Sequence, residues 1–271
     1  MSADRFRLIL HDTLATAPFV IPWIEEWFPA PADIDLVVDS TTTPLEARAN
    51  DILLAPVSEA VRWQETHVVE PSIASVAGPV GSVAMRVPVR PDDIERTSIR
   101  LWQTSGAAEL LARATIRPFY GIEPQRWLEN DADDAGAQVV VVEGAEALRP
   151  PEAGFAEDLC RAWFILTGTP AVSHVLLAPR DLPLDLLSPA MEALATCRGL
   201  AHQRRREVRH RLADRYDLAV ELVATYLAGQ RLELDSAARR GLSLLLVRGT
   251  PGSRYPSPAI TFRDTPTVQR S

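Results

Sequence analysis

The chain of 271 residues combines 46% hydrophobic with 24% charged residues and has a formal net charge of −8. This balance is typical of a soluble globular protein, and the negative charge argues against a nucleic-acid partner. No apolar run approaches the ~20 residues that a membrane-spanning helix needs, so we expect no membrane partner.

The basic residues are all arginine, 28 in number, because the sequence contains no lysine. Lysine Schiff-base chemistry, pyridoxal phosphate attachment and a phosphate-loop lysine are therefore excluded. Any fixed positive charge in a pocket must be a guanidinium, which suits bidentate recognition of a carboxylate. The two cysteines, Cys160 and Cys197, have neither metal nor redox spacing and are predicted to be reduced and structural. The start of the chain lacks a signal-peptide pattern, which predicts a cytoplasmic location.

Strand and helix signals alternate along the first part of the chain, which indicates a mainly parallel sheet covered by helices. In such sheets, ligands collect beyond the carboxyl ends of the strands. The predicted elements are strands at 6–10, 35–38 and 52–55, a helix from Pro18 to about Phe28, and a short helix after Pro56.

Residues 73–85 contain two strand-like apolar runs that are joined by small residues around Gly78 and Pro79. Glycine allows close approach of a backbone, and proline fixes φ, so such a loop can hold amides toward a small anion. A simple turn between two strands is the alternative.

A second α/β unit follows, and helices dominate the last third of the chain. The predicted elements are strands at 98–101, 138–142 and 172–178, helices at 107–119 and up to Thr167, and helical sequence from 184 to 247 with interruptions near Arg215 and Gln230. We therefore expect two lobes joined by crossings near Val87 and Val172, with a ligand cleft between them. The expected boundaries are 1–86 with 176–248 for the first lobe, 87–175 for the second, and 249–271 for an irregular tail.

Hydroxyl groups near the expected cleft are candidates for binding a carboxylate. Thr104 and Ser105 stand at a helix start, where free N–H groups and the helix dipole favour an anion, and Ser82 follows the glycine-rich loop. Simple N-capping is the alternative for the helix start. Asp12 and Thr13 end the first strand, where they can face the cleft or form an Asx-type turn.

Two histidines are weak candidates for a general base. His11 ends the first strand at the mouth of the expected cleft, and His174 lies on the return crossing. A satisfied structural histidine is the alternative for both. His202 and His210 lack carboxylate or cysteine partners, so no metal site is expected. The arginine-rich run 204–211 is predicted to be a solvated helix face.

Five stretches together resemble a known family. They are Thr-Ala-Pro-Phe at 16–19, Ala-Pro-Val-Ser-Glu at 55–59, Gly-Pro-Val-Gly-Ser-Val at 78–83, Trp163 with Leu-Thr-Gly-Thr-Pro at 166–170, and Tyr226-Leu227 with Leu234 and Arg-Gly-Leu at 240–242. In this order they look like the futalosine-pathway menaquinone enzymes, and most like the chorismate dehydratase family, whose fold is that of the type II periplasmic binding proteins.

The resemblance implies an α/β protein with two lobes, a ligand cleft between them and no cofactor. Catalytic residues stay unassigned, with His11 and Asp12 as weak candidates. The positions that the resemblance places at the ligand are Thr13, Ala15, Thr16, Ser58, Gly78, Ser82, Thr104, Ser105, Gly106 and Gly144.

Two departures from the family pattern fall where the ligand is expected. Ala15 replaces an asparagine and Ala145 replaces an aspartate, so two hydrogen-bonding side chains are lost. Glu143 either substitutes for the acid missing at Ala145 or lies in a solvated turn.

The function implied by the resemblance is a hydro-lyase that removes water from chorismate and gives an enolpyruvyl-benzoate. Ala15 and Ala145 favour an alternative, a non-catalytic binder or sensor of a small carboxylate on the same scaffold. A third reading is the related lyase that makes a dihydroxynaphthoate, because His11-Asp12-Thr13 resembles the Asn-Asp-Thr turn of that subfamily. The sequence leaves the oligomeric state open.

Overall fold

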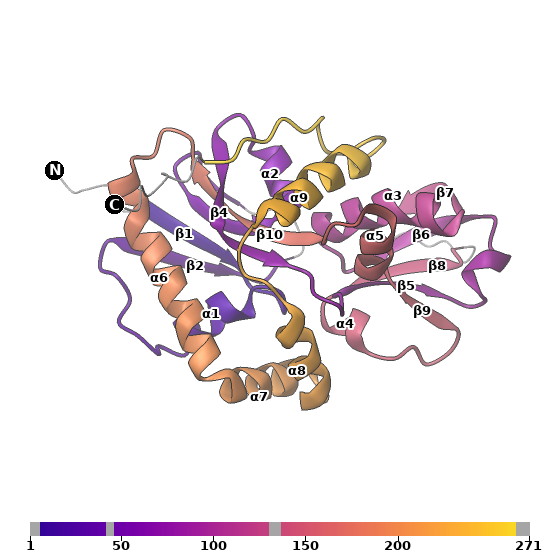
Figure 1. The fold of residues 1–271 in the computed structure, drawn as a ribbon, viewed down its shortest axis with the longest axis horizontal. Coiled ribbons are helices and arrows are strands. Elements are labelled where there is room, and N and C mark those ends of the chain that lie inside the picture. Colours follow the sequence, from indigo (N-terminus) through magenta and orange to yellow (C-terminus); the bar gives the residue numbers. More distant parts are fainter. Residues whose placement is uncertain (1–5, 42–45, 130–136, 264–271) are drawn as a thin grey trace.

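The computed structural model describes residues 6–41, 46–129 and 137–263, which form two lobes side by side (Figure 1). Each lobe is built on a five-stranded sheet with helices packed on it. The predicted two-lobed α/β architecture is therefore confirmed. Within the described ranges, no helix is both long and apolar enough to cross a membrane.

The first lobe contains the sheet β2-β1-β3-β10-β4 and most of the C-terminal helices. Its strands are β1 (Phe6–His11), β2 (Ile34–Asp39), β3 (Ile52–Pro56), β4 (His67–Val76) and β10 (Val172–Pro179). Its helices are α1 (Ala17–Ile24), α2 (Val57–Arg62), α6 (Leu184–Gln203), α7 (Arg205–Tyr216), α8 (Val220–Gly229) and α9 (Ser236–Gly249).

The second lobe contains the sheet β7-β6-β8-β5-β9. Its strands are β5 (Val83–Val87), β6 (Arg96–Trp102), β7 (Glu123–Leu128), β8 (Val139–Glu143) and β9 (Phe155–Asp158). Its helices are α3 (Gly106–Tyr120), α4 (Ala145–Leu148) and α5 (Leu159–Thr167), with a 3₁₀ turn at Pro91–Asp93.

Strand β1 illustrates why these sequences form central strands. Leu8 and Leu10 point to one face and pack with α1 and α6, whereas Ile9 points to the other face. Because both faces of β1 are covered by other elements, its central residues form an unbroken apolar run, as in other buried parallel strands. The core that contains Ile9 continues through α9 and α3 into the second lobe, where it includes Met85 and Trp163. The two lobes therefore share one apolar core.

The chain passes between the sheets in two short segments, residues 77–82 and 168–171. The expected crossings near Val87 and Val172 are thus displaced, because β5 pairs with β8 and β9 in the second sheet. Residues 83–86 belong to the second lobe, and 172–175 belong to the first. Beyond α9 the described tail forms turns and one bridge from Phe262 to Val69, and residues 264–271 lie outside the described ranges.

In each sheet, four strands share one direction and one strand runs the opposite way. The reversed strands are β5 and β10, each of which follows a crossing. After a crossing, the chain enters the next sheet at the edge where the other strands have their carboxyl ends. The entering strand therefore runs antiparallel to those strands. This topology brings the carboxyl edges of both sheets to the two crossings.

Candidate functional site

A small cavity lies between the lobes at the two crossings, where the ligand cleft was expected. Its volume of about 20 Å³ is enough for roughly one water molecule. Both lobes contribute to its wall, which consists of Ser75, Ala77, Ser82, Val83, Ala107, Leu111, Glu143, Cys160, Ala171, Val172, Ser173 and Tyr226. This interlobe cavity joins residues from both sheets with residues from α3, α5 and α8.

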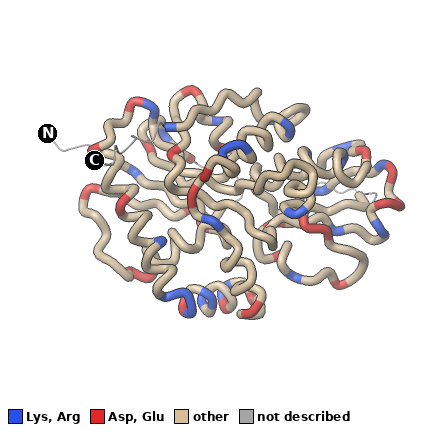
Figure 2. The backbone as a smooth tube through the Cα atoms, viewed as in Figure 1, with Lys and Arg blue, Asp and Glu red and all other residues tan. Residues whose placement is uncertain are grey.

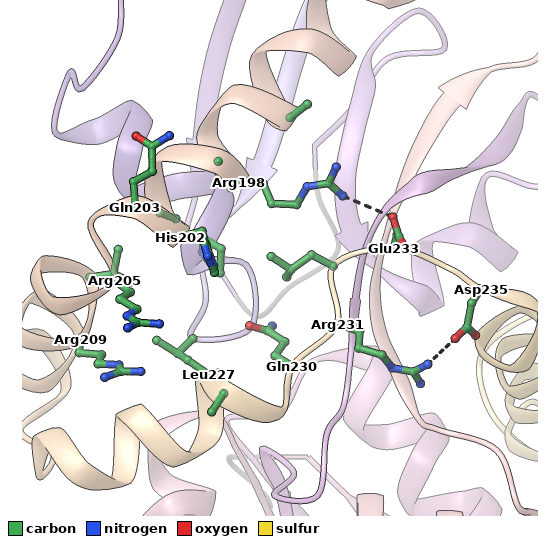
Figure 3. A pocket seen from close by; sticks show the side chains of 17 residues that line it. Arg198, His202, Gln203, Arg205, Arg209, Leu227, Gln230, Arg231, Glu233 and Asp235 are labelled. Atoms are coloured by element: carbon green, nitrogen blue, oxygen red, sulfur yellow. Dashed lines mark hydrogen bonds and ion pairs between the residues drawn. The ribbon is translucent and has the colours of Figure 1, made fainter.

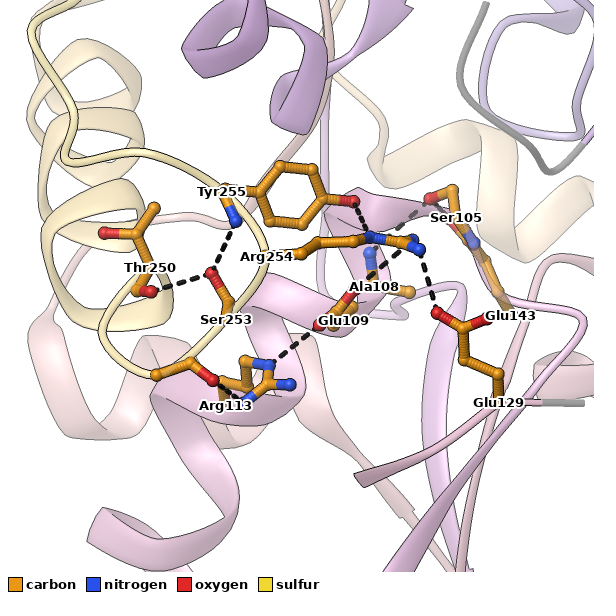
Figure 4. Close-up of polar contacts among 11 residues, drawn as sticks. Ser105, Ala108, Glu109, Arg113, Glu129, Glu143, Thr250, Ser253, Arg254 and Tyr255 are labelled. Carbon is orange, nitrogen blue, oxygen red and sulfur yellow. Dashed lines mark hydrogen bonds and ion pairs between the residues drawn. The ribbon is translucent and has the colours of Figure 1, made fainter. Parts of the chain in front are cut away.

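The start of α3 is occupied by the carboxyl group of Glu143 (Figure 4). The backbone N–H of Ser105 donates to Oε2 of Glu143 at 2.5 Å, and its hydroxyl donates to Oε1 at 2.9 Å. Ser105 also caps the helix by accepting from the N–H of Ala108. Ser105 therefore caps α3, as the alternative interpretation predicted, and a role of this helix start in binding a ligand stays a prediction. Burial raises the pKa of the Glu143 carboxyl above its ordinary value, while the two bonds from Ser105 oppose this shift.

Ser82 faces the cavity from the first crossing, as its predicted role requires. Its hydroxyl lies 3.4 Å from the hydroxyl of Tyr226 on α8, and its carbonyl accepts from the N–H of Gly144 at 2.8 Å. Burial raises the pKa of Tyr226, so its hydroxyl stays protonated. Burial also raises the pKa of the Cys160 thiol, which agrees with a structural role rather than a nucleophilic one.

An amide side chain that is not among the predicted site residues reaches the turn after β1. Gln230 follows α8 and donates to both the carbonyl of Ala15 and the hydroxyl of Ser75, the latter at 2.6 Å. Position 15 lacks the amide side chain that the family pattern places there. The Gln230 amide therefore contacts the turn at position 15, although it comes from a different segment of the same lobe.

The polar side chains in the turn after β1 form hydrogen bonds to other groups of the protein. Both carboxylate oxygens of Asp12 accept from Arg215 of α7, at 2.9 and 2.6 Å. The hydroxyl of Thr16 donates to the carbonyl of His11 and accepts from the N–H of Thr13, so it closes the turn. The turn is thus closed by Thr16, and the Asp12 side chain bonds to Arg215 instead of forming the Asx-type turn given as its alternative.

His11 and His174 form a buried pair in the sheet of the first lobe. Nδ1 of His11 lies 2.9 Å from Nε2 of His174, and the rings are stacked with centroids 5.1 Å apart. The other ring nitrogen of His174 lies 3.1 Å from the hydroxyl of Ser173, which lines the cavity. Burial lowers the pKa of both imidazoles, although the Thr41 carbonyl, Asp39 and Asp12 partly oppose this for His11.

The lobes also meet where α3 lies against α2 and the segment after α9. A methyl group on Gly106 would overlap the hydroxyls of Ser58 and Tyr255, so glycine permits this close approach. Of the remaining predicted positions, Gly144 adopts φ +66° in front of α4, and Thr104 is half-buried.

The C-terminal segment ties α3 to the first lobe by charge (Figure 4). Arg254 lies 3.5 Å from Glu109, which is buried on α3, and 2.9 Å from Glu129. Arg113 donates to Glu109 at 2.9 Å and to the carbonyl of Gly252 at 3.1 Å. These contacts hold the lobes together on the side of α9.

The loop around Gly78 packs against the protein. A methyl group at Gly78 would overlap the backbone of Gly229 at the end of α8, and Pro79 lies against the same residue. The close approach at these small residues is to the backbone of α8, whereas the predicted approach to an anion stays a prediction.

Replacing Gly78 by alanine is expected to lower the free energy of unfolding by about 1–3 kcal/mol, since the methyl group must displace the backbone of α8. The matched control is Gly199→Ala in α6, where no atom lies within 4 Å of the added methyl. Alanine there should raise stability by up to about 1 kcal/mol, because it suits a helix better. Urea denaturation of both variants measures the difference, and equal effects would contradict the close approach at Gly78.

A larger groove of about 910 Å³ lies within the first lobe, between α6, α7 and the segment after α8 (Figure 3). It contains ion pairs from Arg198 to Glu233 and from Arg231 to Asp235. The groove contains none of the predicted site residues and no residue of the second lobe. The helix α7 beside it carries many basic residues (Figure 2) and is largely exposed, as predicted. Its Arg211 pairs with Glu25. The candidate site is therefore the interlobe cavity.

In the described part of the chain, no group of three or more histidine, cysteine, aspartate or glutamate residues is placed to hold a metal ion.

Comparisons with known proteins agree with this architecture. A family model described as menaquinone biosynthesis matches residues 24–250. Protein AF1704 from Archaeoglobus fulgidus aligns with a TM-score of 0.66 and 13% identity, over 90% of this chain and 96% of that chain. A search of curated proteins found no match.

Two binding proteins of known structure are also similar in fold. The periplasmic aliphatic sulphonate binding protein SsuA from Escherichia coli has a TM-score of 0.59 and 15% identity, over 89% of this chain and 90% of that chain. The alkanesulfonate-binding protein SsuA from Xanthomonas axonopodis pv. citri, bound to MOPS, has a TM-score of 0.60 and 16% identity, over 90% and 91%. The predicted periplasmic-binding-protein-like fold is confirmed.

Proposed function

This chain belongs to the menaquinone biosynthesis family, and from that premise we propose that it is a lyase of the chorismate dehydratase kind. The substrate would lie between the lobes, where loss of water converts chorismate into an enolpyruvyl-benzoate. The single observation that carries this proposal is the position of Glu143. Its carboxyl group lines the interlobe cavity and is held at the start of α3 by Ser105.

Elimination of water requires a proton for the leaving hydroxyl and an acceptor for the proton that the carbon loses. Because burial raises its pKa, Glu143 keeps a proton to higher pH than an exposed glutamate does. That proton can pass to the leaving hydroxyl, which departs as water. Ser105 then stabilises the resulting carboxylate through its N–H and hydroxyl, in a place where the helix dipole favours negative charge.

Closure of the lobes supports the same chemistry. A cavity of about 20 Å³ is far smaller than chorismate, so the lobes must separate to admit the substrate and then close over it. Hydroxyl groups of Ser75, Ser82, Ser173 and Tyr226 surround the position and can orient a bound carboxylate. Enclosure of this kind excludes water and holds a reactive conformer.

The second candidate function is binding of a small anion without turnover. The complex of the Xanthomonas SsuA with MOPS favours this reading, since that protein shares the fold. The methyl groups at Ala15 and Ala145 favour it as well, because they remove polar side chains from the expected ligand position.

Incubation of the purified protein with chorismate separates the two candidates. We expect mass spectrometry to show that chorismate loses one water, at a rate proportional to protein concentration. Chorismate recovered unchanged, together with a rise in melting temperature when it is added, would support binding without turnover. Chorismate that is neither converted nor bound would exclude it as the ligand.

A further inference from the structure

An unbroken line of hydrogen-bonding groups leads from the interlobe cavity into the first lobe. The hydroxyl of Ser173, on the cavity wall, lies 3.1 Å from Nδ1 of His174. Nε2 of His174 lies 2.9 Å from Nδ1 of His11, and Nε2 of His11 lies 2.8 Å from the carbonyl oxygen of Thr41. Both imidazoles are at most 2% exposed, so they meet water only through their partners.

The neutral state of this line has only one arrangement of hydrogens. The Thr41 carbonyl only accepts, so Nε2 of His11 carries a hydrogen and Nδ1 of the neutral ring is bare. Nε2 of His174 must then donate to His11, which leaves Nδ1 of His174 as an acceptor. The hydroxyl of Ser173 donates to that nitrogen.

The same heavy atoms also suit a state with one additional proton. The hydroxyl of Ser173 lies 3.3 Å from the carbonyl of Ser75 and can turn its hydrogen to that oxygen. His174 then donates from Nδ1 to Ser173 and accepts at Nε2 from Nδ1 of His11. His11 becomes an imidazolium that still donates to Thr41. Every group keeps a partner, and no ring has to move.

We propose that Ser173, His174 and His11 form a proton relay that accepts the proton released by the substrate in the interlobe cavity. The identity of that substrate rests on the function proposed above. Ser173 is the catalytic residue because it lines the cavity, and the two histidines act through it.

The proposed step balances. The C–H bond of the substrate breaks, its electron pair forms the new double bond, and the C–O bond to the leaving hydroxyl breaks. The released proton binds Oγ of Ser173, whose own proton passes to Nδ1 of His174. The Nε2 proton of His174 passes to Nδ1 of His11. Glu143 supplies the proton that turns the leaving hydroxyl into water, so the protein gains one proton and loses one.

The charged groups around the pair suit a positive charge on His11. Asp39 and Asp12 both favour its protonated form, and Arg215 balances the charge of Asp12. His174 faces His11, and a charge on His11 disfavours protonation of His174. The additional proton therefore belongs on His11, the member of the pair that has carboxylates nearby.

Histidine NMR tests the relay without depending on chorismate. In the ¹⁵N-labelled protein at neutral pH, we expect hydrogens on Nε2 of both His11 and His174. As the pH falls, His11 should gain a proton while the hydrogen of His174 moves from Nε2 to Nδ1, and Ser173→Ala should abolish this coupled change. A hydrogen on Nδ1 of His174 at neutral pH, or independent titration of the two rings, would overturn the relay whatever the substrate is.

Kinetics test whether turnover uses the relay. In the wild type, kcat should fall at low pH as His11 becomes protonated, because a protonated relay accepts no further proton. Burial lowers the pKa of His11, so this fall should lie below pH 6.5, the ordinary pKa of histidine. Ser173→Ala should lower kcat by about 10²- to 10⁴-fold and remove this limb, whereas Ser173→Thr keeps a hydroxyl and should retain the limb. The control is His67→Gln, since His67 is another buried histidine of this sheet, bonded to Thr66 and to the Asp51 carbonyl.

The outcomes separate the relay from the proposed function. If Ser173→Ala behaves like His67→Gln, with a similar kcat and an unchanged pH profile, the relay does not serve turnover. If the wild type leaves chorismate intact while the coupled NMR change is present, the proposed function fails and the relay stands.

Discussion

Replacing Glu143 by glutamine is expected to lower kcat for the loss of water from chorismate by about 10²- to 10⁴-fold, the usual contribution of a general acid. Glutamine has nearly the same shape and its carbonyl can still accept from Ser105, but it has no acidic proton to give. KM should change little. In the wild type, kcat should fall at high pH as Glu143 loses its proton, and this limb should vanish in the variant.

The matched control for this substitution is Glu129→Gln. It also removes a carboxylate, but one that pairs with Arg254 and does not line the cavity. Its kcat should stay near that of the wild type. If Glu143→Gln turns over chorismate at the wild-type rate, Glu143 is not the proton donor. Under the binding alternative, Glu143→Ala should instead tighten the binding of a small carboxylate, because it releases the N–H and hydroxyl of Ser105.

Replacing Trp163 by alanine is expected to lower the free energy of unfolding by about 3–5 kcal/mol, since it empties a large volume in the shared core. Trp163 has 0% exposure and lies in α5 within the apolar cluster that spans both lobes. Chemical denaturation followed by circular dichroism measures the loss.

The matched variant is Trp163→Phe, which keeps an aromatic ring in the same place. The indole N–H of Trp163 has no hydrogen-bond partner in the described part of the chain, so phenylalanine also removes an unsatisfied donor. We expect a loss below about 1.5 kcal/mol. A loss for alanine that is no greater than the loss for phenylalanine would show that the site collapses around the smaller side chain.

The secondary structure that the sequence predicted well is the part with a strong apolar pattern. Strands β1, β3 and β8 are buried on both faces and are bounded by turn residues, so their pattern leaves little choice. The edge strands β7 and β9 were not predicted. Their sequences, Glu-Pro-Gln-Arg-Trp-Leu and Phe-Ala-Glu-Asp, contain proline or charge, as exposed edges often do, and they look like loops.

The candidate site could be predicted by position but only partly by chemistry. The carboxyl ends of strands and the helix start at Ser105 were found from local rules, and the structure brings them to the two crossings. The occupant of that helix start could not be found locally, because Glu143 lies 38 residues away. The His11–His174 contact joins residues 163 apart across β3, so no spacing rule predicts it.

The shared core between the lobes has a consequence for the rate of ligand binding. If a ligand binds between the lobes as proposed, the packing of α3 on α9 and the contact of Arg254 with Glu109 have to break before it can enter. At high ligand concentration, the observed association rate then levels off at the rate of opening. The apparent dissociation constant is raised by the small fraction of molecules that are open at any moment, so weakening this contact would strengthen binding without touching the cavity.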